Sequence, residues 1–158
     1  MAGYGEPGVS SVDADGLRLG IVAARWHGDL VDHMVERAEA AAKACGVDQV
    51  TTVRVAGSVE LPIVAQALSR DHDAVVALGV VVKGETAHFD YVCRSVTDGL
   101  TRVSLDSGCP VGQGVLTVYD VEQARARAGL PGSTEDKGWS ATVAALDAAL
   151  ALVQVHRA

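Results

Sequence analysis

The chain has 158 residues, 49% of them apolar and only 4% aromatic, and its formal net charge is −7. A chain of this length can bury about 70% of its unfolded surface, which predicts one domain with a core of Val, Ala and Leu. Nucleic-acid binding requires a basic surface that neutralises phosphates, so the acidic balance argues against a nucleic-acid partner.

The three cysteines are isolated and show no CxxC spacing, which argues against a disulfide framework and against a zinc or other metal site. The N-terminus lacks a basic region followed by an apolar core, and no uninterrupted apolar run approaches the ~18 residues of a membrane span. We therefore expect a cytoplasmic protein that has no membrane partner.

The first part of the chain predicts an arm, a strand and a helix. Residues 1–16 are rich in Gly, Ser and Asp and are expected to form a flexible or partner-docked N-terminal arm, leaving 17–158 as a single domain. LRLGIVAARW (17–26) has the character of a strand. In 28–46, apolar residues recur every three or four positions, which predicts a helix that ends at Gly46.

The same alternation continues to the C-terminus. The expected elements are a strand over 50–57, a helix over 60–72, a strand over 74–82, a helix from His88 with Thr86 as N-cap, a strand over 114–118, a helix over 120–129 and a final helix from about Lys137. Strands that alternate with helices predict a three-layer α/β/α sandwich, flavodoxin-like, around a central four-stranded parallel sheet. Ligands of such sheets bind beyond the carboxyl ends of the strands.

The segment KGETAH (83–88) follows the third strand and resembles an anion site. A helix start exposes backbone N–H groups and the positive end of the helix dipole, and both attract a phosphate. His88 lies in the first turn, where Lys83 and the helix end would favour the neutral imidazole as a proton acceptor. The alternative is an ordinary turn and cap with a structural histidine.

Other candidates at this edge also have simpler roles. Glu60 could accept hydrogen bonds from ligand hydroxyls or merely complement a helix N-terminus, and Trp26 could stack on a planar ring or pack in an interface. Arg127 and Lys137 could bind a phosphate or solvate a helix surface. The Gly-rich nucleotide-binding motifs and the GxSxG elbow are absent from the sequence. The spacing of the candidate residues therefore predicts a pocket that tolerates a phosphate, but it does not identify a reaction.

Four separated motifs give the chain a specific resemblance. GSVELP (57–62), ALGVVVKGETAHFDYV (77–92), GVLTVYDVEQARARAG (114–129) and DKG (136–138) resemble the lumazine synthase family in the same order along the chain. The resemblance implies the penultimate step of riboflavin biosynthesis. In that step, 5-amino-6-ribitylamino-uracil and 3,4-dihydroxy-2-butanone 4-phosphate form 6,7-dimethyl-8-ribityllumazine, without a cofactor or metal.

The resemblance also implies residue roles. His88 would be the general acid/base, Trp26 would stack on the pyrimidine, and Ser58 and Glu60 would hold the ribityl chain. The remaining implied contacts are Val59, the main chain of Val80, Val81 and Val82, and Lys137 for the substrate, and Gly84, Glu85, Thr86 and Arg127 for the phosphate. Gln113 departs from the Phe or Asn common in the family, so the wall that a neighbouring subunit contributes would bind the ring differently.

The family resemblance further implies a homo-oligomer with active sites between adjacent subunits. The length of the loop 130–136 favours a pentamer or decamer over an icosahedral shell, and riboflavin synthase is left open as a further partner. Two other functions remain in competition: a non-catalytic flavin or lumazine binder, and a cage protein with a vestigial pocket.

Overall fold

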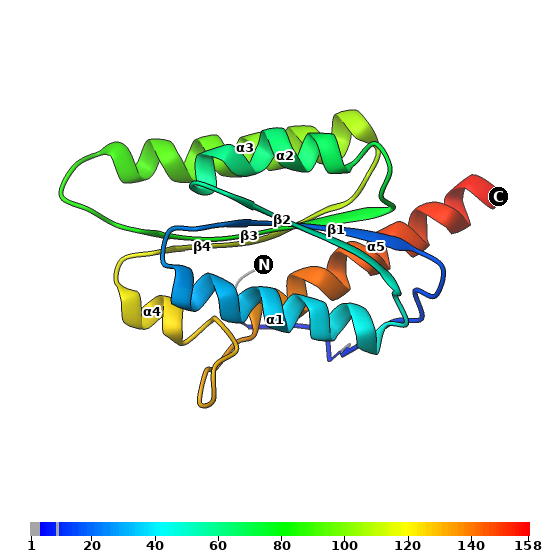
Figure 1. The fold of residues 1–158 in the computed structure, drawn as a ribbon, viewed down its shortest axis with the longest axis horizontal. Coiled ribbons are helices and arrows are strands. Elements are labelled where there is room, and N and C mark those ends of the chain that lie inside the picture. The colour runs from blue at the N-terminus through cyan, green and yellow to red at the C-terminus, as the bar shows by residue number, and fades with distance from the viewer. Residues whose placement is uncertain (1–3, 9) are drawn as a thin grey trace.

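The computed structural model describes residues 4–8 and 10–158, which form a sheet covered by helices on both faces (Figure 1). The strands are β1 (Arg18–Ala24), β2 (Gln49–Val55), β3 (Ala74–Val82) and β4 (Val111–Val118). The helices are α1 (Gly28–Ala44), a 3₁₀ turn η1 (Ser58–Glu60), α2 (Leu61–Leu68), α3 (His88–Ser107), α4 (Val121–Arg125) and α5 (Lys137–Arg157).

The four strands are all parallel and lie in the order β2-β1-β3-β4. The first seven residues of β3 are buried, as expected for an inner strand covered on both faces. The predicted α/β/α sandwich with a central four-stranded parallel sheet is therefore confirmed, and β2 and β4 form the two edges of the sheet.

Successive side chains of β3 enter two separate cores, because side chains alternate between the faces of a strand. Val76 and Leu78 pack in the core under α1 and α5, which also includes Met34 and Leu146. Val75 and Ala77 pack in the core under α2 and α3, with Leu61 and Leu100. The alternation explains why the whole strand is apolar.

Small residues allow α5 to approach both α1 and the sheet. A side chain at Gly138 would collide with the main-chain carbonyl of Met34 in α1, and one at Gly112 would collide with that of Ala141 in α5. Close approach of this kind fits a core built from Ala, Val and Gly with few aromatic residues. It also explains the high alanine content of α5.

By length and composition, α5 could cross a membrane, and it is the only such helix in the part of the chain that the structure describes. Its buried residues include Thr142, Val143, Leu146 and Ala149, and these belong to the contacts that α5 makes with α1, β3 and β4. The apolar character of α5 therefore has an explanation within the fold, as the core helix of an α/β domain.

Several predicted boundaries are wrong by a few residues. β4 begins at Val111 and not at residue 114, since Gly112 and Gly114 lie buried next to α5 as strand residues. The helix predicted over 60–72 ends at Leu68, whose carbonyl accepts from the His72 ring at 2.8 Å. The helix predicted over 120–129 spans only Val121–Arg125, and β1 ends at Ala24, so Trp26 lies in the turn that follows.

Part of the predicted N-terminal arm packs on the chain itself. Residues 1–3 and 9 of this arm lie outside the described residues. Ala14 is fully buried, and its N–H donates to the Cys45 carbonyl at 2.8 Å. The indole N–H of Trp139 donates to the Ser10 carbonyl at 2.7 Å. A contact of the arm with a neighbouring chain stays a prediction.

Candidate functional site

The carboxyl ends of the four strands lie at one edge of the sheet, on the left in Figure 1. There α1, α3, α4 and the η1–α2 segment each begin shortly after a strand. Their first N–H groups have no partner within the helix, and their dipoles point positive ends at this edge. The edge is therefore favourable for an anion and contains most of the candidate residues.

Trp26, Gly57 and Glu60 lie against one another at this edge. The Gly57 N–H donates to Oε2 of Glu60 at 2.9 Å. A Cβ atom at Gly57 would lie 3.2 Å from Oε2 of Glu60 and 3.2 Å from Cδ1 of Trp26, so only glycine leaves both in place without adjustment. Trp26 is 69% exposed, which leaves its ring available to a planar ligand.

The turn that carries Trp26 is strained at the next residue. His27 has φ of 53°, and it is the only described non-glycine residue with positive φ. The turn is held because the His27 carbonyl accepts the N–H groups of Leu30 and Val31, both at 3.0 Å. Strain of this kind persists only where the surrounding structure fixes it, and it is frequent at ligand sites.

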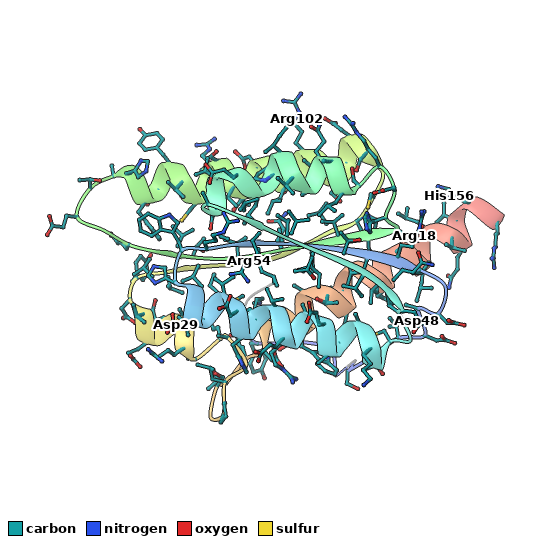
Figure 2. The ribbon with its side chains drawn as sticks, viewed as in Figure 1. Arg18, Asp29, Asp48, Arg54, Arg102 and His156 are labelled. Carbon is teal, nitrogen blue, oxygen red and sulfur yellow. The ribbon has the colours of Figure 1, made fainter. Side chains whose placement is uncertain are left out.

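Arg54 ties the end of β1 to α1, below the sheet in Figure 2. Its Nη2 lies 2.7 Å from Oδ1 of Asp32 and donates to the Ala24 carbonyl at 3.2 Å. These contacts fix the last residue of β1 and, with it, the turn that carries Trp26.

Ser58 is the one buried side chain of the described residues whose hydroxyl lacks a hydrogen-bond partner. The residue is 7% exposed, and a Cβ atom at Gly79 of β3 would lie 2.6 Å from its Oγ. Leaving a hydroxyl buried and unpaired costs about 1–3 kcal/mol, so such a group in a native fold indicates a ligand or a water. Its neighbour Val59 is half exposed.

The segment 80–88 runs from the buried strand to the open helix start. Val80 is buried, Val81 and Val82 are intermediate, and residues 83–88 are exposed. The N-cap position of α3 is Ala87, so the predicted cap at Thr86 is wrong by one residue. The Thr86 hydroxyl nevertheless accepts from the His88 N–H at 3.3 Å. Gly84, Glu85 and Thr86 together leave a polar loop open to an anion.

Aromatic residues flank this loop on the side of β4. The Lys83 ammonium lies 5.3 Å from the centre of the Tyr119 ring, within the range of a cation–π contact. Phe89 lies 6.3 Å from the same ring. Lys83 and Tyr119 meet because they directly follow the paired residues Val82 and Val118, and the sequence pattern does not show that β3 and β4 are neighbours.

Arg127 and Lys137 lie together with Glu135, on the α4 side of the sheet, while α3 lies on the other side (Figure 1). Nε of Arg127 lies 3.8 Å from Oε1 of Glu135, and Nζ of Lys137 lies 3.8 Å from Oε2 of the same carboxylate. Sequence reasoning missed Glu135, because its position depends on how the loop 130–136 folds back.

Gln113 lies apart from the other candidates in its own chain. It occupies the edge strand β4 opposite Ala77 of β3, three residues before Val80, which corresponds to about 10 Å along a strand. Its side-chain amide donates to the hydroxyl of Thr101 in α3 at 3.0 Å, and the residue is exposed.

Two surface hollows lie away from the candidate residues. One, of about 270 Å³, is lined by His72, Cys109 and His156 at the opposite end of the sheet, and the other, of about 340 Å³, lies beside Cys45. Burial, reinforced by Asp73, raises the pKa of the Cys109 thiol to about 11, so this cysteine is an inert thiol at neutral pH. The described residues contain no cluster of three metal-ligating side chains.

Comparison with known proteins connects these features with a family. The family model described as 6,7-dimethyl-8-ribityllumazine synthase matches residues 16–152. The chain is similar to proteins of that name from Salinispora arenicola, 74% identical over 96% of this chain and 92% of the relative, and from Thermobifida fusca, 60% identical over 100% and 92%. A relative of the same name from Mycobacteroides abscessus is 58% identical over 99% of this chain and 98% of its own length.

Proposed function

The chain belongs to the 6,7-dimethyl-8-ribityllumazine synthase family, transferases of riboflavin biosynthesis, and from this premise we propose which substrates it joins and how. The proposed reaction condenses 5-amino-6-ribitylamino-uracil with 3,4-dihydroxy-2-butanone 4-phosphate. It proceeds through an imine, loss of the phosphate and closure of the second ring to 6,7-dimethyl-8-ribityllumazine.

The group formed by Trp26, Ser58 and Glu60 is proposed to bind the pyrimidine substrate. The exposed indole of Trp26 supplies a stacking surface for the ring. The unpaired Ser58 hydroxyl and the Glu60 carboxylate supply partners for the hydroxyl groups of the ribityl chain. Val59 and the main chain of Val80–Val82 complete the wall beside the ring.

The start of α3 is proposed to bind the phosphate of the second substrate. Gly84, Glu85 and Thr86 are exposed directly before the helix, where N–H groups and the helix dipole favour an anion. Arg127 would add a charge-assisted fork, with Lys137 nearby. These two cations belong to the opposite face of the sheet in the same chain, which favours a site completed by the cations of a neighbouring chain.

His88 is proposed to move protons between the two substrates. Its ring is exposed at the first position of α3, and among the described residues no side chain forms a hydrogen bond with it. Holding two reactants in position can remove roughly 7–11 kcal/mol of a barrier, and a positioned acid/base group adds ~10²–10⁴-fold in rate. Orientation therefore supplies most of the catalysis, and His88 the remainder.

The unpaired, buried hydroxyl of Ser58 carries the proposal, since it is a binding group that the fold leaves without a partner beside Trp26 and Glu60. The test mixes the purified protein with the two substrates and follows lumazine absorbance and fluorescence. Formation of the lumazine at a rate above the uncatalysed reaction supports the proposal. A rate equal to that of the substrates alone contradicts it.

A further inference from the structure

Glu135 lies between the two cations that the proposed function assigns to the phosphate. Its two carboxylate oxygens face different partners, Nε of Arg127 and Nζ of Lys137, each at 3.8 Å. The side chains of Glu135 and Lys137 are only 26% and 22% exposed. The single carboxylate of Glu135 is therefore the counter-ion of both cations.

The main chain fixes this arrangement. The Glu135 N–H donates to the Ala126 carbonyl at 3.0 Å, its carbonyl accepts from Gly129 at 3.0 Å, and the Lys137 N–H donates to the Arg127 carbonyl at 2.9 Å. Gly129 has φ of +74°, and a side chain there would collide with the carboxylate of Asp136. The loop 130–136 therefore folds back onto the end of α4 in one register, which returns Glu135 to Arg127.

Arg127 is also held from its own helix. Its Nη1 donates to the Gln123 carbonyl at 2.9 Å, so the guanidinium has a fixed direction while its Nε faces Glu135. The side chain remains 39% exposed, which leaves one side of the fork accessible to an anion from outside.

A carboxylate and a phosphate are alternative partners for the same guanidinium fork. Two cations that share one carboxylate keep a single net positive charge, which weakens their attraction for an incoming anion but does not remove it. Glu135 therefore competes with a phosphate for Arg127 and Lys137.

We propose that Glu135 is an internal counter-ion that sets the affinity of the site for phosphate. It offsets one of the two positive charges of Arg127 and Lys137 in the empty site, the substrate phosphate displaces it, and it returns as inorganic phosphate leaves. This inference rests on the proposed function, because it takes Arg127 and Lys137 as the phosphate cations.

The test compares Glu135→Gln with the wild type in the lumazine assay and in titration calorimetry with inorganic phosphate, both on the assembled protein. The variant keeps the shape of the side chain and loses its charge. We expect the KM for the phosphorylated substrate and the inhibition constant of inorganic phosphate to fall about two- to fivefold, the span of a partly exposed ion pair. The KM for the pyrimidine should stay unchanged.

Glu122→Gln is the matched control, because Glu122 is an exposed carboxylate of α4 that pairs with Arg125 at 3.5 Å. It removes the same charge nearby and should leave both phosphate constants unchanged. In an Arg127→Ala background, Glu135→Gln should have a much smaller effect, since the two residues would act on the same anion. If Glu135→Gln does not fold, Glu135→Asp is the second variant, because its shorter side chain moves the carboxylate away from the two cations. It should lower the KM for the phosphorylated substrate and the inhibition constant of phosphate to a smaller extent.

Constants equal to those of the wild type, or equal falls in Glu122→Gln, overturn the proposal and leave Glu135 as a structural ion pair. A rise in the phosphate constants overturns it too, because Glu135 would then position Arg127 for binding. A wild type that forms no lumazine contradicts the proposed function instead, so the two failures are distinguishable.

Discussion

Ser58 and His88 are two polar groups at the carboxyl edge that remain available to a ligand. The Ser58 hydroxyl is buried without a partner, and the His88 ring is exposed at the start of α3. A buried hydroxyl without a partner is unfavourable for the fold alone, which fits a Ser58 side chain kept for a ligand. The two groups act differently, since Ser58 would bind substrate and His88 would transfer protons.

Replacing His88 by alanine should lower kcat about 10²- to 10⁴-fold, the contribution of a positioned acid/base group. Activity above background should remain, because the substrates are still held together. Steady-state kinetics on the variant measures both. His156→Ala is a control, since Figure 2 shows His156 in the last part of α5, at the far end of the molecule from the carboxyl edge. Wild-type rates in His88→Ala would remove His88 from its role.

Replacing Arg127 by alanine should raise the KM for the phosphorylated substrate about tenfold or more, because a charge-assisted hydrogen bond contributes roughly 1.5–3 kcal/mol. The KM for the pyrimidine should change little. Arg125→Ala serves as the control, since Arg125 pairs only loosely with Asp29 and Glu122 on the surface. An unchanged KM for the phosphorylated substrate would count against Arg127 as a phosphate-binding residue.

At the scale of elements, the sheet and its helices follow from hydrophobic patterning. The apolar run of β3 and the three-and-four spacing of α1 identify the strand and the helix from the sequence, because burial on two faces or on one face requires those patterns. The start of β4 was missed because glycine lowers strand propensity, and Gly112 is a strand residue only because α5 packs onto it.

The candidate site was predictable only in part. Four of its residues follow the ends of the adjacent strands β1 and β2, namely Trp26, Gly57, Ser58 and Glu60. A sequence pattern that predicts the parallel sheet therefore also places them at one edge. The position of Glu135 depends on how the loop 130–136 folds back, which no periodicity encodes. The contact of Lys83 with Tyr119 depends on the pairing of Val82 with Val118, because each of the two residues directly follows one member of that pair. The unpaired state of Ser58 depends on Gly79 of another strand.

The contact between α1 and α5 should be sensitive to a single methyl group. In Gly138→Ala the new Cβ would meet the Met34 carbonyl, and backbone atoms cannot yield as a flexible side chain can. We expect a loss of about 1–3 kcal/mol in the free energy of unfolding, measured by denaturant titration. Gly28→Ala, where nothing lies within 4 Å, should be neutral or slightly stabilising. Equal stability of Gly138→Ala and the wild type would mean that the helices are not packed this closely.

At the scale of the whole molecule, one chain exposes surfaces that a partner would cover. β2 and β4 form open edges of the sheet, and Ile63 of α2 and Tyr91 and Leu105 of α3 are each at least 65% exposed. Exposed apolar side chains on neighbouring helices are typical of interfaces. Together with Gln113 lying away from the other candidates, they support the proposal of a homo-oligomer with shared sites.

We expect a closed ring of subunits, the symmetric form that a repeated heterologous contact generates. A pentamer of the 16.3 kDa chain has a mass of about 82 kDa, and a decamer twice that. Light scattering coupled to size-exclusion chromatography measures the mass directly. A monomer would contradict the shared site, and a particle of megadalton mass would overturn the preference for a pentamer or decamer.

The most direct test is a crystal structure of the protein with a product mimic bound. We predict the mimic at the carboxyl edge, with its ring on Trp26, its ribityl chain on Ser58 and the His88 imidazole within the roughly 2.6–3.2 Å at which proton transfer occurs. A mimic bound elsewhere, for example in the hollow beside His72 and Cys109, with the His88 ring turned away, would contradict the account.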